Sequence, residues 1–180
     1  MIRPVNMVII FLLAFPLITT ANDYEKDFRL AKGRAGVLEI GMKADSIYHF
    51  FSVNKAELVD LQLEGMPTPA FKIYYENAET PTLVVEIALK SEMVIDKIHV
   101  KDKRFRLDSD VGIGSTLGEL RKHYQVKWIN YCDKGFMCAK VESLNMLFKL
   151  NYRSPSEEWL RTEDPKEIPD SPQIIEIFLE

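Results

Sequence analysis

Twice along the chain, the spacing of the hydrophobic positions changes from that of a helix to that of β-strands. In 44–51 and in 117–124, apolar residues recur three and seven positions apart, which places them on one face of a helix. Each segment is followed by four runs that alternate apolar and polar residues or are rich in β-branched and aromatic residues, as strands are. These runs are 56–65, 70–77, 82–90 and 93–101, and then 126–132, 136–143, 145–152 and 173–180. The pattern predicts a helix followed by an antiparallel meander, given twice.

The turn that precedes each helix also repeats. When 37–53 is set beneath 110–126, Ile40-Gly41 aligns with Ile113-Gly114. We therefore predict an α+β fold of two tandem helix-plus-four-strand repeats, whose strands form one extended antiparallel sheet or two sheets side by side. The helices would cover one face and leave the other free. The predicted parts are an N-terminal segment at 22–34, a first repeat at 35–101, a linker at 102–110 and a second repeat at 111–180.

The glycine-rich stretch "VGIGSTLGEL", 111–120, raises the question of a phosphate-binding loop. Its glycine spacing, G-x-G-x-x-x-G, misses the dinucleotide fingerprint, and no Lys follows as in a P-loop. A structural role fits better, with Gly114 at a tight turn and Thr116 and Glu119 forming a capping box. Gly41 occupies the same turn in the first repeat, where Lys43 stands in place of the capping Thr.

The first residues have the pattern of an export signal. Arg3 precedes an apolar run at 7–18, and small residues follow at 19–21. The run is too short to span a bilayer, which needs roughly 17–25 residues. We predict a signal peptide at 1–21, so that the mature chain is periplasmic or extracellular and has no stable membrane span. An uncleaved signal anchor is the alternative.

Two cysteines, Cys132 and Cys138, flank a turn signal between two strand-like runs. In an oxidising compartment this arrangement predicts a disulfide across a hairpin. The formal net charge of −4 argues against binding to nucleic acid or to anionic lipid.

Candidate catalytic chemistry is sparse. His49, His99 and His123 do not have metal-ligand spacing, and Ser115 lacks the G-x-S-x-G context. Glu157 and Glu158 are adjacent, so they cannot face each other on a helix as an acid–base pair. We therefore predict a protein that is not an enzyme and that has no cofactor and no metal.

Two segments have the composition of an interaction surface. The first is 97–106, rich in Lys and Arg, which is either a solvated linker or a contact for an acidic partner. The second is the long acidic loop 153–172, which opens with a helix predicted to have Ser154 as N-cap and Pro155 at N1. Its Trp159 either anchors an interface or packs on its own domain. The candidate interface residues are Trp159, Tyr74, Tyr75, Trp128, Arg104 and Arg106.

An Ile-Gly turn, a short helix and four antiparallel strands, given twice over 35–180, resemble the β-lactamase-inhibitor-protein-like repeat. The unit is also similar to the small outer-membrane-assembly lipoproteins of the SmpA type. The resemblance implies an exported protein that binds other proteins on a sheet surface without catalysis. The chain departs from both groups, since it lacks a lipidated Cys, has two repeats and has a single pair of cysteines. No target and no binding residue are therefore carried over.

The predicted function is that of an exported, non-catalytic protein-binding module. Its partner would be another exported or envelope protein, bound on the free sheet face. The alternative is a periplasmic small-ligand carrier with a pocket between sheet and helices, and an enzyme of an unrecognised type ranks third. The sequence leaves the oligomeric state open.

Overall fold

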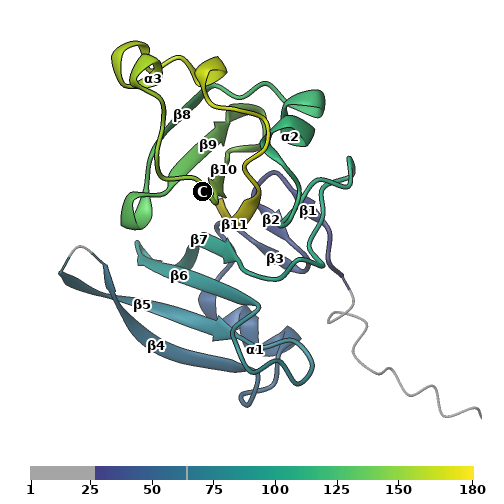
Figure 1. Ribbon diagram of the computed structural model, residues 1–180. Helices are drawn as coiled ribbons and strands as arrows, with labels where there is room; N and C mark the ends of the chain where they lie inside the picture. Colours follow the sequence, from purple (N-terminus) through teal and green to yellow (C-terminus); the bar gives the residue numbers. More distant parts are fainter. Residues whose placement is uncertain (1–26, 64) are drawn as a thin grey trace, which may run out of the picture.

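One antiparallel sheet of eight strands dominates the computed structural model, which describes residues 27–63 and 65–180. The strands lie in the order β4-β5-β6-β7-β11-β10-β9-β8, so the first four and the last four meet at β7 and β11 (Figure 1). Their bounds are β4 Ala56–Leu63, β5 Met66–Ile73, β6 Leu83–Leu89, β7 Met93–Val100, β8 Trp128–Tyr131, β9 Met137–Val141, β10 Met146–Leu150 and β11 Ile174–Leu179. The predicted α+β class and large antiparallel sheet are confirmed. The predicted signal peptide lies outside the described residues.

The strand β5 begins earlier than the sequence pattern indicates. Gly65 has a φ of +80° and makes the turn, but Met66 and Pro67 already pair with β4. The strand β6 pairs only with the second half of β5, from Ala70 onward, so the β4–β5 hairpin extends beyond its neighbour. Prolines, which cannot donate a hydrogen bond, are tolerated in this part because it has a partner on one side only.

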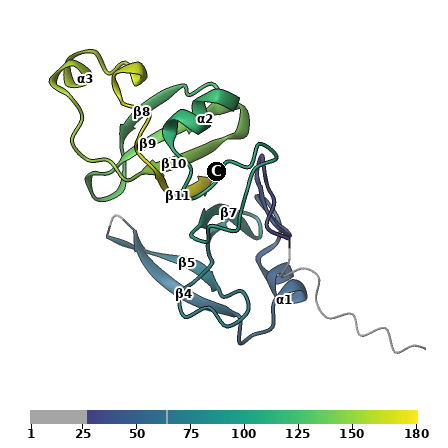
Figure 2. The ribbon, with the colours of Figure 1, turned by 45° about the vertical axis from the view of Figure 1, so that its right-hand side comes forward.

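A small second sheet and a few short helices complete the fold (Figure 2). The small sheet consists of β1 Leu30–Ala31, β2 Arg34–Ala35 and β3 Leu38–Glu39, and it was not predicted, because strands of two residues carry no alternating pattern. The α-helices are α1 Ile47–Phe50, α2 Leu117–His123 and α3 Glu157–Thr162. The 3₁₀ turns are η2 Ala44–Ser46, η3 Asp133–Gly135, η4 Glu142–Leu144 and η5 Pro165–Glu167.

The predicted capping box is present at the start of α2. Gly114 has a φ of +92°, the Thr116 side chain accepts a hydrogen bond from the Glu119 N–H, and the Glu119 carboxylate accepts one from the Thr116 N–H at 2.6 Å. Gly41 makes the corresponding turn with a φ of +87°. Lys43 there provides no side-chain cap, and the helical segment is a 3₁₀ turn followed by a single α turn.

The start of α3 corrects one expectation. Ser156, and not Ser154, is the N-cap, because its hydroxyl accepts a hydrogen bond from the Trp159 N–H at 3.1 Å. Pro155 therefore lies outside the helix. Starting the helix at Glu157 leaves both Glu157 and Glu158 in the first turn and buries the side chain of Trp159.

The hydrophobic core lies along one face of the whole sheet. One row in register crosses all eight strands, and each of its members is at most 2% exposed: Ala56, Ile73, Leu83, Val100, Ile177, Phe148, Ala139 and Ile129. Ile47 of α1 and Leu117 and Leu120 of α2 belong to the same core. A single core therefore joins the first and second halves of the chain.

Candidate functional site

The second face of the sheet carries the candidate site. Successive side chains of a strand point to opposite faces, so the row next to the core row faces away from the core. That row contains Lys72, Val84, His99, Phe178, Leu147, Lys140 and Trp128. It is neither purely polar nor fully exposed, and charged residues of this face are deeply buried, with Glu86 7%, Lys140 8% and Lys149 5% exposed.

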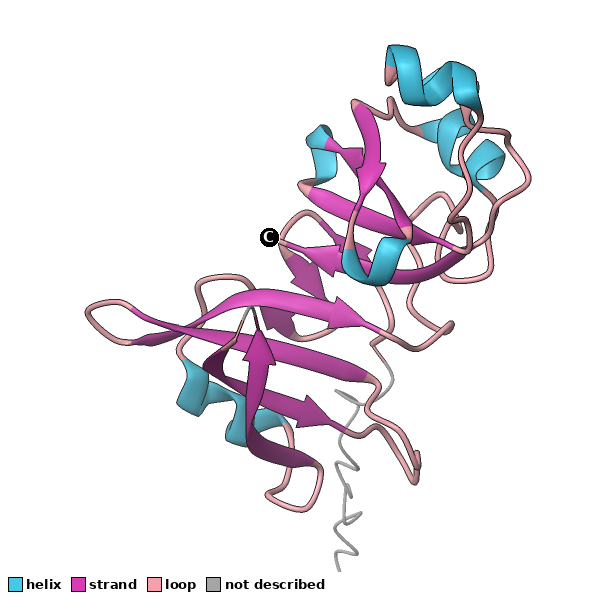
Figure 3. Ribbon diagram, turned by 60° about the vertical axis from the view of Figure 1, so that its left-hand side comes forward, coloured by secondary structure: helices cyan, strands magenta, loops and turns pink. Residues whose placement is uncertain are grey.

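This face is hollowed into a groove of about 740 Å³, which we call the sheet groove. It runs from the β4–β5 hairpin across the sheet to the disulfide beside β9. Its lining residues belong to both sets of strands, which Figures 1 and 3 show as ribbons. Its lining mixes apolar and charged side chains, among them Met66, Glu86, Lys97, His99, Leu147 and Phe178. A concave surface with few, defined polar groups is the usual form of a binding site.

An ion cluster lies on the same face of the sheet, and two of its members, Glu86 and His99, line the sheet groove. The Nε2 atom of His99 lies 2.5 Å from Oε1 of Glu86, and its Nδ1 atom lies 3.8 Å from Oε1 of Glu176. The Nζ atoms of Lys101 and Lys149 lie 2.8 and 3.4 Å from the same Glu176 carboxylate. These five residues, Glu86, His99, Lys101, Lys149 and Glu176, form the glutamate–histidine cluster.

The protonation states of this cluster follow from its geometry. Burial raises the pKa of Glu176, but the nearby His99 ring, the contact with the Lys101 ammonium group and the charges of Lys101 and Lys149 lower it to about 2. Burial lowers the pKa of His99, but hydrogen bonds to Glu176 and Glu86 and the charges of both carboxylates raise it above its usual value. The hydrogen bond from His99 lowers the pKa of Glu86. Both carboxylates are therefore ionised near neutral pH, and the charged form of His99 is favoured.

The disulfide between Cys132 and Cys138 forms one side of the sheet groove and confirms the predicted pairing, with Cα atoms 5.8 Å apart. A second ion pair lies beside it, since Nζ of Lys140 is 2.8 Å from both Oε2 of Glu180 and Oδ1 of Asn145. The covalent link and the ion pair together fix the β8–β9–β10 side of the groove.

Both ring nitrogens of His99 are engaged by carboxylates within the chain. Each ring nitrogen of His99 faces a glutamate of a neighbouring strand, so neither nitrogen is directed toward a bound molecule. A general base must reach the proton that it removes. The part of the chain that the structure describes contains no group of three His, Cys, Asp or Glu side chains that could hold a metal ion.

Two of the predicted interface residues are core residues. Tyr75 is 0% exposed and its ring packs against those of Phe28, Phe51 and Phe105, while Trp159 is 3% exposed and packs against Tyr131. Neither side chain can contact a partner from the surface. Large aromatic side chains gain most from full burial, which explains why these two lie inside.

Two other predicted residues lie on the groove side of the sheet, near its ends. Trp128 closes the row on β8 and is 38% exposed. Tyr74 follows β5 and is half-buried, and its hydroxyl donates a hydrogen bond to Glu57 at 3.3 Å. Neither Tyr74 nor Trp128 lines the sheet groove.

The linker arginines are engaged within the chain. Arg104 forms ion pairs with Asp102 at 2.7 Å and with Glu76 at 3.0 Å, and its guanidinium lies 4.2 Å from the centre of the Phe28 ring. Arg106 donates a hydrogen bond to Ser115 at 3.4 Å. Because Asp102 and Glu76 already balance the charge of Arg104, this residue is a poor contact for an acidic partner.

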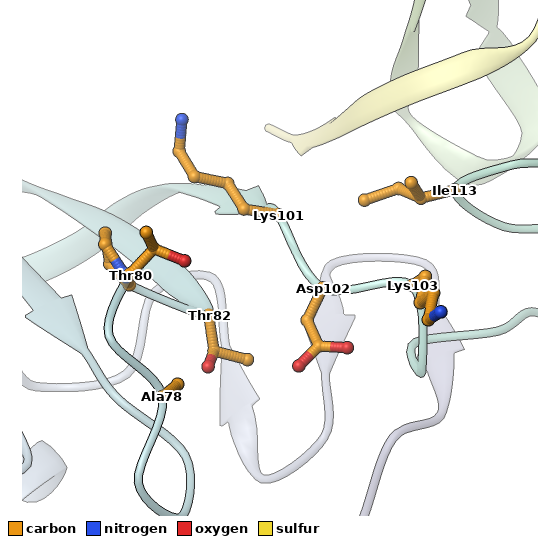
Figure 4. Close-up of a pocket in the computed structure, with 8 residues that line it drawn as sticks. Ala78, Thr80, Thr82, Lys101, Asp102, Lys103 and Ile113 are labelled. Carbon is orange, nitrogen blue, oxygen red and sulfur yellow. The ribbon is translucent and has the colours of Figure 1, made fainter.

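A second cavity of about 370 Å³ lies beside the linker, between the loop that precedes β6 and the residues after β7 (Figure 4). Lys101, Asp102 and Lys103 line it together with Thr80 and Thr82. The Asp102 carboxylate is held by Arg104, and the Thr82 hydroxyl accepts a hydrogen bond from the Tyr75 N–H at 3.1 Å. Since its polar groups serve the fold, the sheet groove is the stronger candidate. Neither cavity lies between sheet and helices.

Sequence reasoning missed the glutamate–histidine cluster. The spacing of His99 argues only against a metal site, and no sequence motif contains Glu86 or Glu176. Strand alternation does place all three on the polar face of their strands. The predicted meander already places β6 beside β7, but the pattern does not indicate that β11 lies on the other side of β7, and this order is what brings the three side chains together.

Comparison with known proteins supports the fold alone. No protein-family model matches the chain, and no curated protein matches it in sequence. The crystal structure of the uncharacterized protein yfeY from Escherichia coli is similar, with a TM-score of 0.56 over 85% of this chain and 97% of that one. The two sequences are 11% identical. Among the described residues, no helix has the length and apolar character needed to cross a membrane.

Proposed function

We propose that this chain is an exported, non-catalytic protein-binding module whose sheet groove receives a segment of a partner protein. The observation that carries the proposal is the buried charge on the face opposite the core. Taking an ion out of water costs several kcal/mol, and pairing offsets this cost only partly. The other face of the sheet already carries the hydrophobic core that stabilises the fold. Binding of a partner therefore explains the charged, concave face better than a contribution to stability does.

The length of the sheet groove favours a polypeptide as its occupant. The lining residues come from seven adjacent strands, β4 to β9 in sheet order. At a strand spacing of about 4.8 Å, the groove crosses about 29 Å of sheet. An extended chain of about nine residues, at roughly 3.3 Å per residue, covers this distance.

Export and internal duplication belong to the same proposal. The disulfide is consistent with an oxidising compartment, where such bonds persist. The strand order is mirrored about the junction of β7 and β11, as expected if the two halves are copies of one helix-plus-four-strand unit with the helices on one face.

Site-specific photo-crosslinking tests the proposal. A benzophenone side chain is placed at Leu147, in the groove, and at Leu160, which is 58% exposed on α3, as the control position. We expect the groove position alone to crosslink to one protein in cells of the source organism, and that protein, once purified, to bind the wild-type chain. Equal crosslinking from both positions, or none from Leu147, would overturn the proposal.

A small-ligand carrier is the second candidate, and the groove volume favours it, since ligand pockets measure about 300–1,000 Å³. A ligand that binds only the folded state raises the melting temperature. A melting screen of the purified protein against soluble metabolites therefore separates the two functions: a saturable rise that is lost in a Leu147→Glu variant supports the carrier.

A further inference from the structure

The outer edge of β4 is open along the β4–β5 hairpin. β4 is the first strand of the large sheet and pairs with β5 on its inner side (Figure 1). The Tyr74 N–H donates a hydrogen bond to the Lys55 carbonyl at 2.8 Å, which continues the β4–β5 register. Because hydrogen bonding alternates along an antiparallel pair, Leu58, Asp60 and Gln62 direct their backbone groups away from β5. Among the described residues, no backbone group bonds to these three from outside the hairpin.

The hairpin blocks its second open edge, on the β5 side, but leaves this one unblocked. The Ile73 carbonyl accepts a hydrogen bond from the Thr82 N–H, so alternate residues back along β5, which include Pro69 and Pro67, face the β6 side. There β6 pairs with β5 only from Ala70 onward, and a proline has no N–H to offer a further strand. The eight residues of β4 include no proline and pair with β5 without a bulge, although such features commonly protect edge strands.

The two edges of the large sheet differ in length. β4 has eight residues, whereas β8, at the opposite edge, has four. Pairing of β4 with β8 of another copy would therefore use a short strand, and it would leave a free edge at each end, from which filaments grow. Pairing of β4 with β4 of a second copy uses the longer strand on both sides and closes as a two-fold dimer.

The sequence of β4 complements itself in one antiparallel register. Paired residues of a sheet point to the same face, so the two-fold axis must pass through a residue. An axis at Val59 pairs 56–62 with itself, places Asp60 opposite Leu58, and sets no like charges opposite each other. An axis at Asp60 gives the same length but opposes two Asp60 carboxylates, which is destabilising. Axes nearer to either end of β4 pair fewer residues.

We infer that β4 binds β4 of a second copy of this chain, antiparallel and with Val59 on the two-fold axis, so that two eight-stranded sheets join edge to edge. Leu58 of one copy and Asp60 of the other then exchange both of their backbone hydrogen bonds. The two sheet grooves come to lie on the same side of the joined sheet. This inference goes beyond the proposed function and does not rest on it.

The same pairing covers an exposed apolar side chain. Leu58 is 57% exposed, and it lies opposite Phe71, against which the half-exposed Tyr48 ring packs. With the axis at Val59, the Leu58 side chains of the two copies are diagonal neighbours, which lie within reach across a strand pair. A strand pair is smaller than the roughly 1,200–2,000 Å² that stable interfaces bury. We therefore expect a reversible dimer whose population rises with protein concentration.

Sedimentation equilibrium of the purified protein tests the inference through one pair of variants. In the proposed register, Leu58→Lys places a cation opposite Asp60 of the second copy, and Leu58→Glu places an anion there. We expect the Lys variant to dimerise at least about ten times more tightly than the Glu variant. Leu160→Lys and Leu160→Glu form the matched control, because Leu160 on α3 is 58% exposed, and these two variants should dimerise equally.

Cysteine crosslinking tests the register itself. The two Val59 residues would form a non-hydrogen-bonded pair, with Cα atoms about 4.5 Å apart, which suits a disulfide. Val59→Cys should therefore give a covalent dimer under mild oxidation, whereas the more exposed Gln62→Cys should not, because residue 62 lies opposite residue 56. Both native cysteines are already joined to each other, so the new bond reports on the introduced residue alone.

Three outcomes would overturn the inference: a monomer at every concentration reached, equal dimerisation of Leu58→Lys and Leu58→Glu, or crosslinking at Gln62 in place of Val59. The last two would mean that the copies associate through another surface or register. Thermal unfolding of each variant checks that the fold is kept. Photo-crosslinking at Leu147 decides the proposed function separately, since that position lies in the sheet groove and away from the β4 edge.

Discussion

Phe148 and Leu147 are neighbours on β10, but their side chains leave the sheet on opposite faces. Phe148 is 0% exposed in a row of apolar residues that crosses every strand. Leu147 is half-buried in the sheet groove, in a row that contains His99 and Lys140. Both faces bury side chains, one by close packing of apolar groups and the other by pairing charged side chains of adjacent strands.

The difference between the two faces separates stability from function. Burial of apolar surface on the core face contributes about 25 cal/mol per Å² to folding. Burial of charge on the groove face costs free energy that ion pairs offset only partly. A sheet with one apolar face needs nothing more to fold, so the charged concave face is where a function is to be sought.

The largest effect should come from the core face. Phe148→Ala removes a fully buried ring and leaves a cavity, so we expect the free energy of unfolding to fall by about 4 kcal/mol. Leu147→Ala, its neighbour in the groove, should cost about 1 kcal/mol or less, because the leucine side chain is only half-buried. Urea unfolding of both variants measures the difference. Equal losses would mean that the groove face is a second core.

Glu176→Gln should have the next largest effect. It leaves His99, Lys101 and Lys149 without their shared carboxylate, and breaking a buried ion pair from one side costs about 3 kcal/mol. Glu158→Gln, which breaks an exposed pair with Arg161, is the control and should cost less than about 0.5 kcal/mol. Both are measured by denaturant unfolding. Similar small losses would show that water reaches the cluster freely.

Loss of the disulfide beside the groove should cost less. Replacement of both Cys132 and Cys138 by Ser removes a short covalent loop, and the chain-entropy relation gives a loss of about 2 kcal/mol. Addition of a reductant to the wild-type protein should produce the same shift in the urea midpoint and should not affect the double variant. An unchanged midpoint in both cases would show that the bond contributes no stability.

The smallest effect should be the pH dependence that His99 causes. Its folded-state pKa is raised above 6.5, so its contribution to stability is fully present below pH 6.5 and is lost as the pH rises through the folded-state pKa. The pKa of Glu176 is lowered from 4.5 to about 2, so its contribution is present above pH 4.5 and is lost as the pH falls toward 2. The two groups together favour mildly acidic conditions.

The variant His99→Gln separates these two contributions. Unfolding free energies measured from pH 5 to pH 8 should decline for the wild-type protein at the upper end, and this decline should be smaller in the variant. The variant should still lose stability below pH 4.5, because Lys101 and Lys149 still lower the pKa of Glu176 when His99 is replaced. An identical decline in both proteins would mean that His99 is not coupled to its two glutamates.

The sequence predicts the strands well and the site poorly. The strands are found because alternation is a property of adjacent residues, and the capping box Thr116–Glu119 and the disulfide span only a few residues. The aromatic candidates show the limit. Tyr74 and Tyr75 are neighbours with the same preference for strands and interfaces, yet Tyr75 is enclosed by three phenylalanine rings and Tyr74 is half-buried.

The amino-acid sequence by itself determined the α+β class, the approximate positions of the strands of the large sheet apart from the start of β5, the turns at Gly41 and Gly114 and the pairing of the two cysteines. Each of these features depends on interactions between residues close in the chain. Only the tertiary structure decided that β7 lies beside β11, and therefore that Glu86, His99 and Glu176 meet on one face of the sheet. The physical reason is that the packing of the whole core selects which distant strands pair. The local pattern of polar and apolar residues shows which face of a strand is buried, but it does not show which distant strand lies beside it.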